Sequence, residues 1–213
     1  QSLYTASTGM LGMQTQIDTT ANNIANVNTI GFKKSRAEFA DLMYKVMEYA
    51  GTSTSDVTKS PTGIEVGLGV RPTAINKIFS EGSLKQTDNE LDLAITGKGF
   101  FKLELPDGTE VYSRNGAFKI DENGTIVYSD GYRMVPEVVI PPDATNVSIG
   151  TDGTVSVVQP GQTQATQVGQ VTLTNFINPA GLHSMGDNLY IETDSSGQPV
   201  EGTPGLDGLG VLR

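Results

Sequence analysis

The amino-acid sequence predicts a mainly β protein in which a long N-terminal α-helix and an extended arm carry an antiparallel β domain. Apolar residues recur at helical spacing at the start of the chain, and a small, polar stretch follows. Short runs rich in valine, isoleucine and aromatic residues then alternate with turn sequences. The expected divisions are residues 1–32 for the helix, 33–75 for the extended connection, 76–200 for the β domain and 201–213 for a glycine-rich return segment.

The first segment has an apolar stripe and almost no charge. Leu3, Met10, Ile17 and Ile24 recur every seven residues, and Asp18 is the only charged residue of residues 1–32. The remaining faces are serine, threonine, glutamine and asparagine, which tolerate burial when they find hydrogen-bond partners. We therefore predict a helix over residues 2–28 that packs against other subunits, with an amphipathic helix lying on its own domain as the alternative. The expected contact positions are Leu3, Ala6, Gly9, Met10, Gly12, Met13, Ile17, Ile24 and Val27.

Glycines weaken this helix and mark its end. Gly9 and Gly12 each cost about 1 kcal/mol relative to alanine, so packing must supply the missing stability. Gly31 is expected to adopt the left-handed conformation that ends a helix. The apolar residues that follow have a spacing that allows a short helix over residues 35–49, with an irregular extended arm as the alternative. Residues 51–63 are small and polar, which predicts a flexible connection.

The β domain is predicted from turn sequences between short apolar runs. Pro106-Asp107-Gly108, Asn123-Gly124, Asp130-Gly131 and Asp152-Gly153 are typical of hairpin turns in an antiparallel sheet. The inward-facing residues should form one core. These are Leu91, Leu93, Ile95, Phe101, Leu103, Val111, Phe118, Ile120, Ile126, Val155, Val157, Val171, Leu173 and Phe176.

The composition narrows the classes of function. The chain has no cysteine and one histidine, which excludes disulfides, thiolate metal sites and histidine-rich metal clusters. A net charge of −10 argues against nucleic acid, because neutralising phosphates needs clustered lysine and arginine. No stretch approaches the roughly twenty apolar residues that span a bilayer, so we expect no membrane insertion. Gly9, Gly12 and Gln14 interrupt any signal-peptide core, so export would use another route.

Signals for chemistry are weak throughout. Asp88, Glu90 and Asp92 alternate, so a strand would place their carboxylates on one face as a cation or acid–base site. The simpler interpretation is a strand with one wet face. Residues 121–124 and Asp187-Asn188 resemble fragments of calcium loops, but they lack the full ligand run and are better explained as turns. We expect no catalytic residue, metal or cofactor, and hence no enzyme.

Four stretches resemble one protein family. ANNIANVNTIGFKKSRAEFADLMY at residues 21–44 is similar to the N-terminal signature of bacterial flagellar basal-body rod and hook proteins, the distal rod members most of all. LDLAITGKGFFKL at 91–103, YSRNGAFKIDENGTIVYSDGYRMVP at 112–136 and NFINPAGLHSMGDNLYIETDSSGQP at 175–199 resemble later motifs, in family order. The residues carried over from the family signature are Asn22, Asn23, Ala25, Asn26, Asn28, Gly31, Phe32, Asn115, Gly116, Asn178, Pro179, Gly181 and Leu182.

The resemblance implies a structural subunit of the distal rod. Such a subunit leaves through the flagellar type III apparatus without a cleaved signal, polymerises into a helical tube across the periplasm and transmits torque from motor to hook. Its implied partners are copies of itself, proximal rod and hook proteins, and the surrounding ring proteins. Family members pair the N-terminal helix with a C-terminal helix, which we expect to be missing here, since GTPGLDGLGVLR at 202–213 resembles only the approach to it.

Two kinds of alternative remain from the sequence. Within the family, the chain could be a hook or proximal rod subunit, although a hook protein usually carries a larger outer insertion. Outside the family, a secreted β-domain adhesin or glycan-binding module would use Tyr112, Tyr128 and Tyr132 as stacking platforms. A glycan-active hydrolase would instead need the paired carboxylates of residues 88–92 in a cleft.

Overall fold

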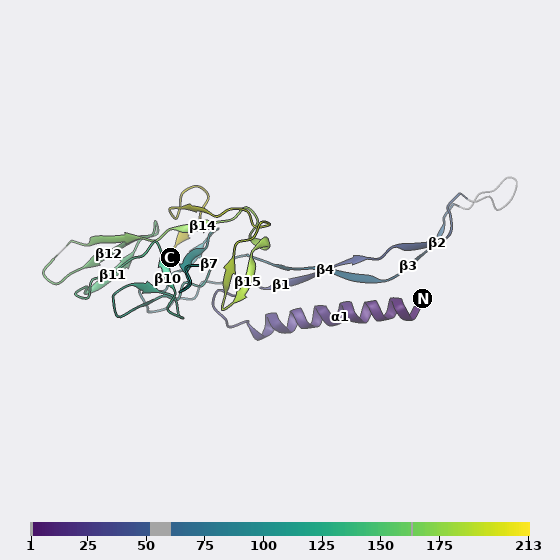
Figure 1. The fold of residues 1–213 in the computed structure, drawn as a ribbon, viewed down its shortest axis with the longest axis horizontal. Coiled ribbons are helices and arrows are strands. Elements are labelled where there is room, and N and C mark those ends of the chain that lie inside the picture. Colours follow the sequence, from purple (N-terminus) through teal and green to yellow (C-terminus); the bar gives the residue numbers. More distant parts are fainter. Residues whose placement is uncertain (1, 52–60, 163) are drawn as a thin grey trace. The chain divides into compact units, whose positions relative to one another are not determined.

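The computed structural model describes residues 2–51, 61–162 and 164–213. They form two compact units (Figure 1). The helical unit comprises the chain up to Asn28 together with residues 33–78, and the β unit comprises residues 29–32 together with 79–213. Most of the predicted flexible connection over residues 51–63 lies outside the described residues.

The helical unit begins with α1, Ser2–Ala25. The helix ends three residues earlier than predicted, because the backbone tightens: the amide of Val27 donates to the carbonyl of Ile24, three residues back, at 3.2 Å. Gly31 then adopts a φ of +77°, as expected for the end of this segment. Nowhere in the described ranges does a helix combine the length and hydropathy needed to cross a membrane.

Two antiparallel ribbons follow the helix. The prediction of a short helix over residues 35–49 is wrong, and the extended alternative is correct. The strands are β1 (Ser35–Asp41), β2 (Tyr44–Glu48), β3 (Ile64–Gly67) and β4 (Val70–Lys77), with β1 paired to β4 and β2 paired to β3. Each strand finds its partner more than ten residues away, and this pairing overrides the local helical spacing of its apolar residues.

The β unit is built from antiparallel sheets. Its largest sheet has seven strands in the order β15-β16-β7-β6-β10-β9-β8, beside a three-stranded sheet β11-β12-β13 and the pairs β14-β17 and β18-β5. The bounds are β5 Ile95–Thr96, β6 Phe101–Glu104, β7 Glu110–Ser113, β8 Lys119–Ile120, β9 Ile126–Val127, β10 Arg133–Val135, β11 Asn146–Ile149, β12 Thr154–Val158, β13 Thr166–Gln170, β14 Leu173–Asn175, β15 His183–Gly186, β16 Leu189–Ile191, β17 Val200–Gly202 and β18 Val211–Leu212. A 3-10 turn, η1, covers Pro179–Gly181.

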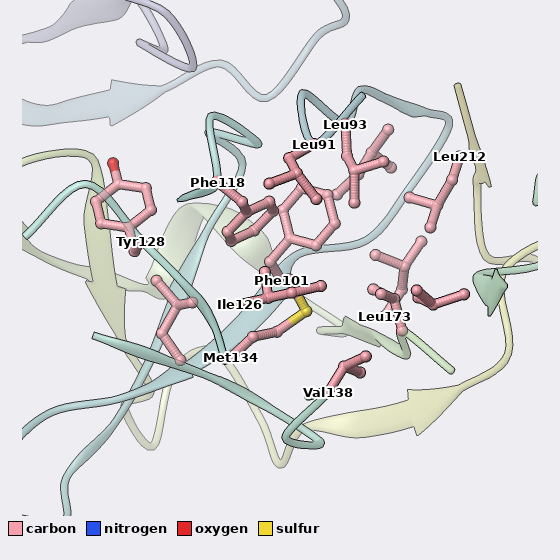
Figure 2. Packing of buried hydrophobic residues seen from close by; sticks show 14 of the residues in the cluster. Leu91, Leu93, Phe101, Phe118, Ile126, Tyr128, Met134, Val138, Leu173 and Leu212 are labelled. Carbon is pink, nitrogen blue, oxygen red and sulfur yellow. The ribbon is translucent and has the colours of Figure 1, made fainter. Parts of the chain in front are cut away.

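Every residue predicted for the core of the β unit is buried except Ile120. Figure 2 shows Phe101 of β6, Met134 of β10 and Phe118, which precedes β8, in the main hydrophobic cluster. Ile120 is 46% exposed because β8 is the outermost strand of its sheet, where one side lacks a covering neighbour. Phe176 belongs to a separate cluster of Phe100, Tyr112, Phe176, Leu182 and Tyr190, whose rings meet edge to face.

The return segment closes onto the β unit. Leu209 and Leu212 are buried, and β18 pairs with β5. Ala94 and Arg213 exchange two backbone hydrogen bonds of 2.7 and 2.9 Å beside this pair. The end of the described chain is therefore part of the core.

One buried lysine joins three strands of the β unit. The ammonium of Lys102 on β6 donates to Glu110 on β7 at 2.6 Å and to Glu201 on β17 at 2.7 Å. Burial alone lowers the pKa of Lys102, but the hydrogen bonds to Glu110 and Glu201 raise it by more, so the net pKa lies above its ordinary value. Its stabilising effect is therefore complete below the ordinary pKa of about 10.4 and is lost as the pH rises through the higher folded-state pKa.

Lys102→Met keeps the apolar stem and removes the charge. We expect the variant to be less stable than the parent by about 1 kcal/mol near neutral pH, and this difference to shrink above about pH 10.5. Urea unfolding of both proteins across this pH range measures the effect. Lys119→Met, at an exposed lysine, is the control, and the same pH dependence in both variants would contradict a special role for Lys102.

Candidate assembly surface

Helix α1 lies along the β1–β4 ribbon (Figure 1). The helix residues on the buried side are small or polar. Gly12 is buried, and a side chain added there would meet Val70 Cγ1 at 3.4 Å and Phe39 Cε1 at 3.5 Å. The positions that are at least partly buried are Thr5, Thr8, Gly9, Gly12, Thr15, Thr19 and Asn23. These residues recur at helical spacing, so they form one face.

The opposite face of α1 is apolar and exposed. Its large side chains, together with Val27 just beyond the helix, have 64% to 85% of their surface accessible: Leu3, Met10, Met13, Ile17, Ile24 and Val27. Ala6 is also exposed. Gly9 belongs to the ribbon-facing side, although nothing lies within 4 Å of a side chain added there. Met13, Gln16, Ile17, Thr20, Ala21 and Ile24 line a shallow groove along this face. We call the side chains of Leu3, Ala6, Met10, Met13, Ile17 and Ile24 the outer stripe.

This orientation reverses that of an ordinary surface helix, which turns its apolar side toward its own domain. The alternative from the sequence, in which the stripe lies on its own domain, is wrong, because the ribbon contacts the face of Gly12 instead. Among the nine expected contact positions, Gly12 is covered by the chain's own ribbon, whereas the side chains of the outer stripe are exposed to solvent. Contact of these positions with other subunits stays a prediction.

The ribbons add apolar surface that the sequence reasoning missed. Met43, Met47 and Tyr49 are 82%, 68% and 74% exposed near β2, and Ile64 and Ile75 are more than half exposed on β3 and β4. Tyr4 and Leu11 of α1 are exposed as well. Two-stranded ribbons are marginally stable in water by themselves, so these exposed apolar residues make the ribbons a further candidate for a contact surface.

The asparagines near the end of α1 make contacts inside the helical unit. Asn23 accepts a hydrogen bond from the amide of Ser35 and donates one to its carbonyl, both at 2.8 Å, which ties the helix to the start of β1. The side chain of Asn26 donates to the carbonyl of Asn22 at 3.0 Å. Asn22, Ala25 and Asn28 are exposed.

Four further signature residues, Gly31, Phe32, Asn115 and Gly116, lie in the β unit. Gly31 fits against Asn115, because an added side chain would come within 2.8 Å of Asn115 Cβ. The space at Gly116 is smaller than at Gly31, because an added side chain would overlap the carbonyl oxygen of Leu93 at 1.7 Å. Phe32 is half-buried next to Gly31.

The signature residues around η1 shape one loop. Asn178 donates to the carbonyl of Ser195 at 3.0 Å, and Pro179 begins the 3-10 turn. Gly181 lies against the backbone of Ser195, where an added side chain would come within 2.8 Å, and Leu182 enters the aromatic cluster. The motif therefore has a structural explanation within the chain.

The carboxylates at residues 88–92 do not form a site. Asp88 lies in a bend, Glu90 in a turn and Asp92 in an isolated β-bridge with Ala117. No strand runs through all three residues, so the predicted alternation of faces is wrong. Asp92 accepts a hydrogen bond from Asn89 at 3.0 Å, and Glu90 accepts one from the amide of Val147 at 3.2 Å. Within the described residues, no three histidine, aspartate or glutamate side chains are grouped to hold a metal ion.

Two of the three tyrosines proposed for glycan stacking are unsuited to it. Tyr112 and Tyr128 are 0% and 3% exposed, and burial raises the pKa of Tyr112 to about 12. Tyr132 is partly exposed, and it packs against the core of the β unit. Asp187 and Asn188 form a hairpin turn with φ values of +50° and +60°, as their interpretation as turn residues requires. The outer stripe is therefore the strongest candidate for a functional surface.

Comparison with known proteins places both units in one group. Residues 3–33 match the family described as flagella basal body rod protein, and residues 94–157 match the flagellar hook protein FlgE/F/G D1 domain. The chain is 50% identical to the flagellar basal-body rod protein FlgG of Buchnera aphidicola subsp. Schizaphis graminum, over 99% of this chain and 81% of that protein. It is 41% identical to the flagellar basal-body rod protein FlgG of Bacillus subtilis, over 100% of this chain and 81% of that protein. The hook protein FlgE of Helicobacter mustelae is 41% identical over 62% of this chain and 29% of its own length.

The close approach at Gly116 predicts a large effect of a single methyl group. Gly116→Ala should lower the free energy of unfolding of the β unit by more than about 2 kcal/mol, because the Leu93 backbone must move. Gly82→Ala is the matched control, since nothing lies within 4 Å of a side chain added there. Chemical denaturation followed by tyrosine fluorescence measures both, and equal stabilities would contradict the packing described.

Proposed function

Because the chain belongs to the flagellar basal-body rod protein family, we propose that it is a structural subunit of the distal rod. Copies of the chain associate into a helical tube that transmits torque from the motor to the hook. The observation that carries this proposal is the outer stripe of α1, an uncharged apolar face that the chain's own ribbon leaves uncovered.

The outer stripe supplies the free energy for association. Burying an exposed leucine, isoleucine or methionine side chain contributes about 1.5–3 kcal/mol, and the stripe offers five of them. Each copy of the chain carries a net charge of −10, so two copies repel each other at a distance. Short-range apolar contacts must therefore hold the copies together. A contact of this face with a different face of the next copy, repeated by rotation and rise, produces an open helical filament.

The relatives favour a rod subunit over a hook subunit. Alignment with the rod proteins spans nearly this whole chain and 81% of each of the two relatives named above, whereas alignment with the hook protein spans 29% of that relative. A hook protein of that length contains much sequence with no counterpart here. The distal rod is therefore preferred, with a proximal rod position as the alternative.

The proposed location follows from this role. The subunit lies in the basal body, where the rod crosses the periplasm, and it is exported through the flagellar type III apparatus without a cleaved signal. Its partners are further copies, proximal rod and hook proteins at the two ends, and the ring proteins around the rod. It catalyses no reaction, and its work is mechanical.

A charge placed in the outer stripe should stop polymerisation. Ile17→Asp and Ile24→Asp each remove a large apolar contact and bury a carboxylate, so we expect the critical concentration to rise more than about a hundredfold. Sedimentation and electron microscopy of the polymers measure this change, and circular dichroism should show an unchanged β unit.

Ser7→Asp is the control for the added charge. Ser7 is exposed in the same helix but lies outside the outer stripe. This variant should polymerise at nearly the parental concentration. Normal tubes from Ile17→Asp would rule out the outer stripe as the assembly surface.

A further inference from the structure

A pocket in the β unit is lined by three phenylalanine rings and one arginine. Its volume is about 470 Å³, which lies within the usual range of ligand cavities. Phe79, Phe100 and Phe176 supply the rings, and Arg114 supplies the charge. Three of the four stretches that resemble the family contribute to its wall: residues 91–103, 112–136 and 175–199. We call this cavity the aromatic pocket, and the proposed assembly surface on α1 leaves it unexplained.

The phenylalanines make the aromatic pocket apolar. The ring of Phe100 contacts the other two edge to face, with its centroid 5.4 Å from that of Phe79 and 5.7 Å from that of Phe176. Phe100 and Phe176 are buried, and Phe79 is partly buried. An aromatic or other large apolar side chain gains favourable contacts among such rings.

Arg114 brings a charge that is only partly satisfied. Its Nη2 donates to the carbonyls of Ile95 at 3.3 Å and Gly97 at 2.8 Å, and its Cζ lies 5.8 Å from the centre of the Phe100 ring. Within the described part of the chain, Nη1 and Nε make no hydrogen bond and no carboxylate forms an ion pair with Arg114. Burial lowers the pKa of Arg114, because the charged guanidinium has lost part of its solvation.

The other charged groups at the aromatic pocket do not neutralise Arg114. Glu81 lines the pocket and acts on Arg114 from beyond ion-pair distance, but its carboxylate accepts a hydrogen bond from the amide of Gly97. Lys98, which is exposed, adds a second positive charge. A chain with a net charge of −10 thus has a local excess of positive charge here, which suits a negatively charged ligand.

The loop between β5 and β6 is packed closely enough to keep the aromatic pocket in shape. Gly97 and Gly99 have φ values of +112° and +138°, which glycine adopts without strain. A side chain added at Gly97 would lie 2.7 Å from Gly210 Cα, and one added at Gly99 would lie 3.2 Å from Leu173 Cβ. The pocket is therefore formed in the free protein, which lowers the entropic cost of binding.

We propose that the aromatic pocket is a docking site for a segment of a partner protein in which a large apolar side chain adjoins a carboxylate. The apolar side chain enters among the phenylalanine rings, and the carboxylate accepts hydrogen bonds from Nη1 and Nε of Arg114. Ile177 favours a peptide over a small molecule, because its side chain is 88% exposed beside the pocket and a chain that continues past the pocket covers it. The site belongs to the β unit of a single subunit and does not depend on polymerisation through the outer stripe.

Three tetrapeptides with acetyl and amide ends separate the two parts of this ligand. Gly-Phe-Asp-Gly has the ring and the carboxylate, Gly-Phe-Asn-Gly lacks the charge, and Gly-Ala-Asp-Gly lacks the ring. Isothermal titration of the full chain at low ionic strength should show that the first peptide binds about tenfold more tightly than either of the others. A charge-assisted hydrogen bond and a buried ring each account for a difference of this size.

Two pairs of variants locate the binding. Arg114→Gln should make the aspartate and asparagine peptides bind equally, whereas Arg133→Gln, at an exposed arginine of β10, should keep the tenfold preference. Ile177→Asp should bind Gly-Phe-Asp-Gly about fivefold more weakly than Ile177→Asn, which has a side chain of the same size without the charge. Because Ile177 is exposed, this second pair tests the site even if Arg114→Gln fails to fold.

Three results would overturn the proposal. The first is equal or undetectable binding of the aspartate and asparagine peptides by the parent. The second is tighter binding of 3-phenylpropionate than of Gly-Phe-Asp-Gly, which would identify a small carboxylate as the ligand. The third is a raised critical concentration for polymerisation in Ile177→Asp but not in Ile177→Asn, without peptide binding, which would assign the aromatic pocket to a second copy of the chain.

Discussion

The way in which helix α1 meets its own ribbon determines the surface that this molecule offers to others. Threonine, glycine and asparagine face the ribbon, and the outer stripe is left in solvent. The close approach at Gly12 makes this possible, because Val70 and Phe39 fill the space where a larger residue would project. A conventional arrangement would bury the stripe internally and leave a subunit with no apolar helix face for another copy.

The β unit has the opposite organisation. Its core is closed, its tyrosines are buried, and its ion pairs centre on Lys102 within the unit. The family signature in this unit serves internal geometry: Gly116 admits the Leu93 carbonyl, and Asn178 and Gly181 shape the loop around η1. Exposed apolar surface thus runs along one face of helix α1 in the helical unit, while the β unit supplies a folded body with a closed core.

Local sequence signals predicted those parts of the fold that depend on local chemistry. Hairpin turns with glycine, and runs of alternating valine and isoleucine, identified the β unit and nearly all of its core. The prediction that Ile120 is buried was wrong, because the position of its strand at the edge of the sheet cannot be predicted from local sequence. Residues 35–49 were open to two interpretations because their partner strands lie across a long connection. The sequence showed that the outer stripe is apolar. It did not show which side of the helix contacts the ribbon, because threonine and asparagine suit both exposure to water and close contact with a backbone. The hydroxyl of Ser113 accepts a hydrogen bond from the amide of Asn115 and donates one to the carbonyl of Asn188. These residues come together only in the folded chain, so no spacing pattern could have joined them.

The pairing of β5 with β18 also determines the order in which the two units become complete. Leu212 must reach Ile95 before this edge of the core is sealed, and the long intervening loop makes that closure slow. Helix α1 forms through backbone hydrogen bonds between residues four apart, and it packs on a ribbon whose last residue is Lys77. In a chain that folds from its N-terminus, helix α1 and the β1–β4 ribbon are therefore complete while the β unit is still open.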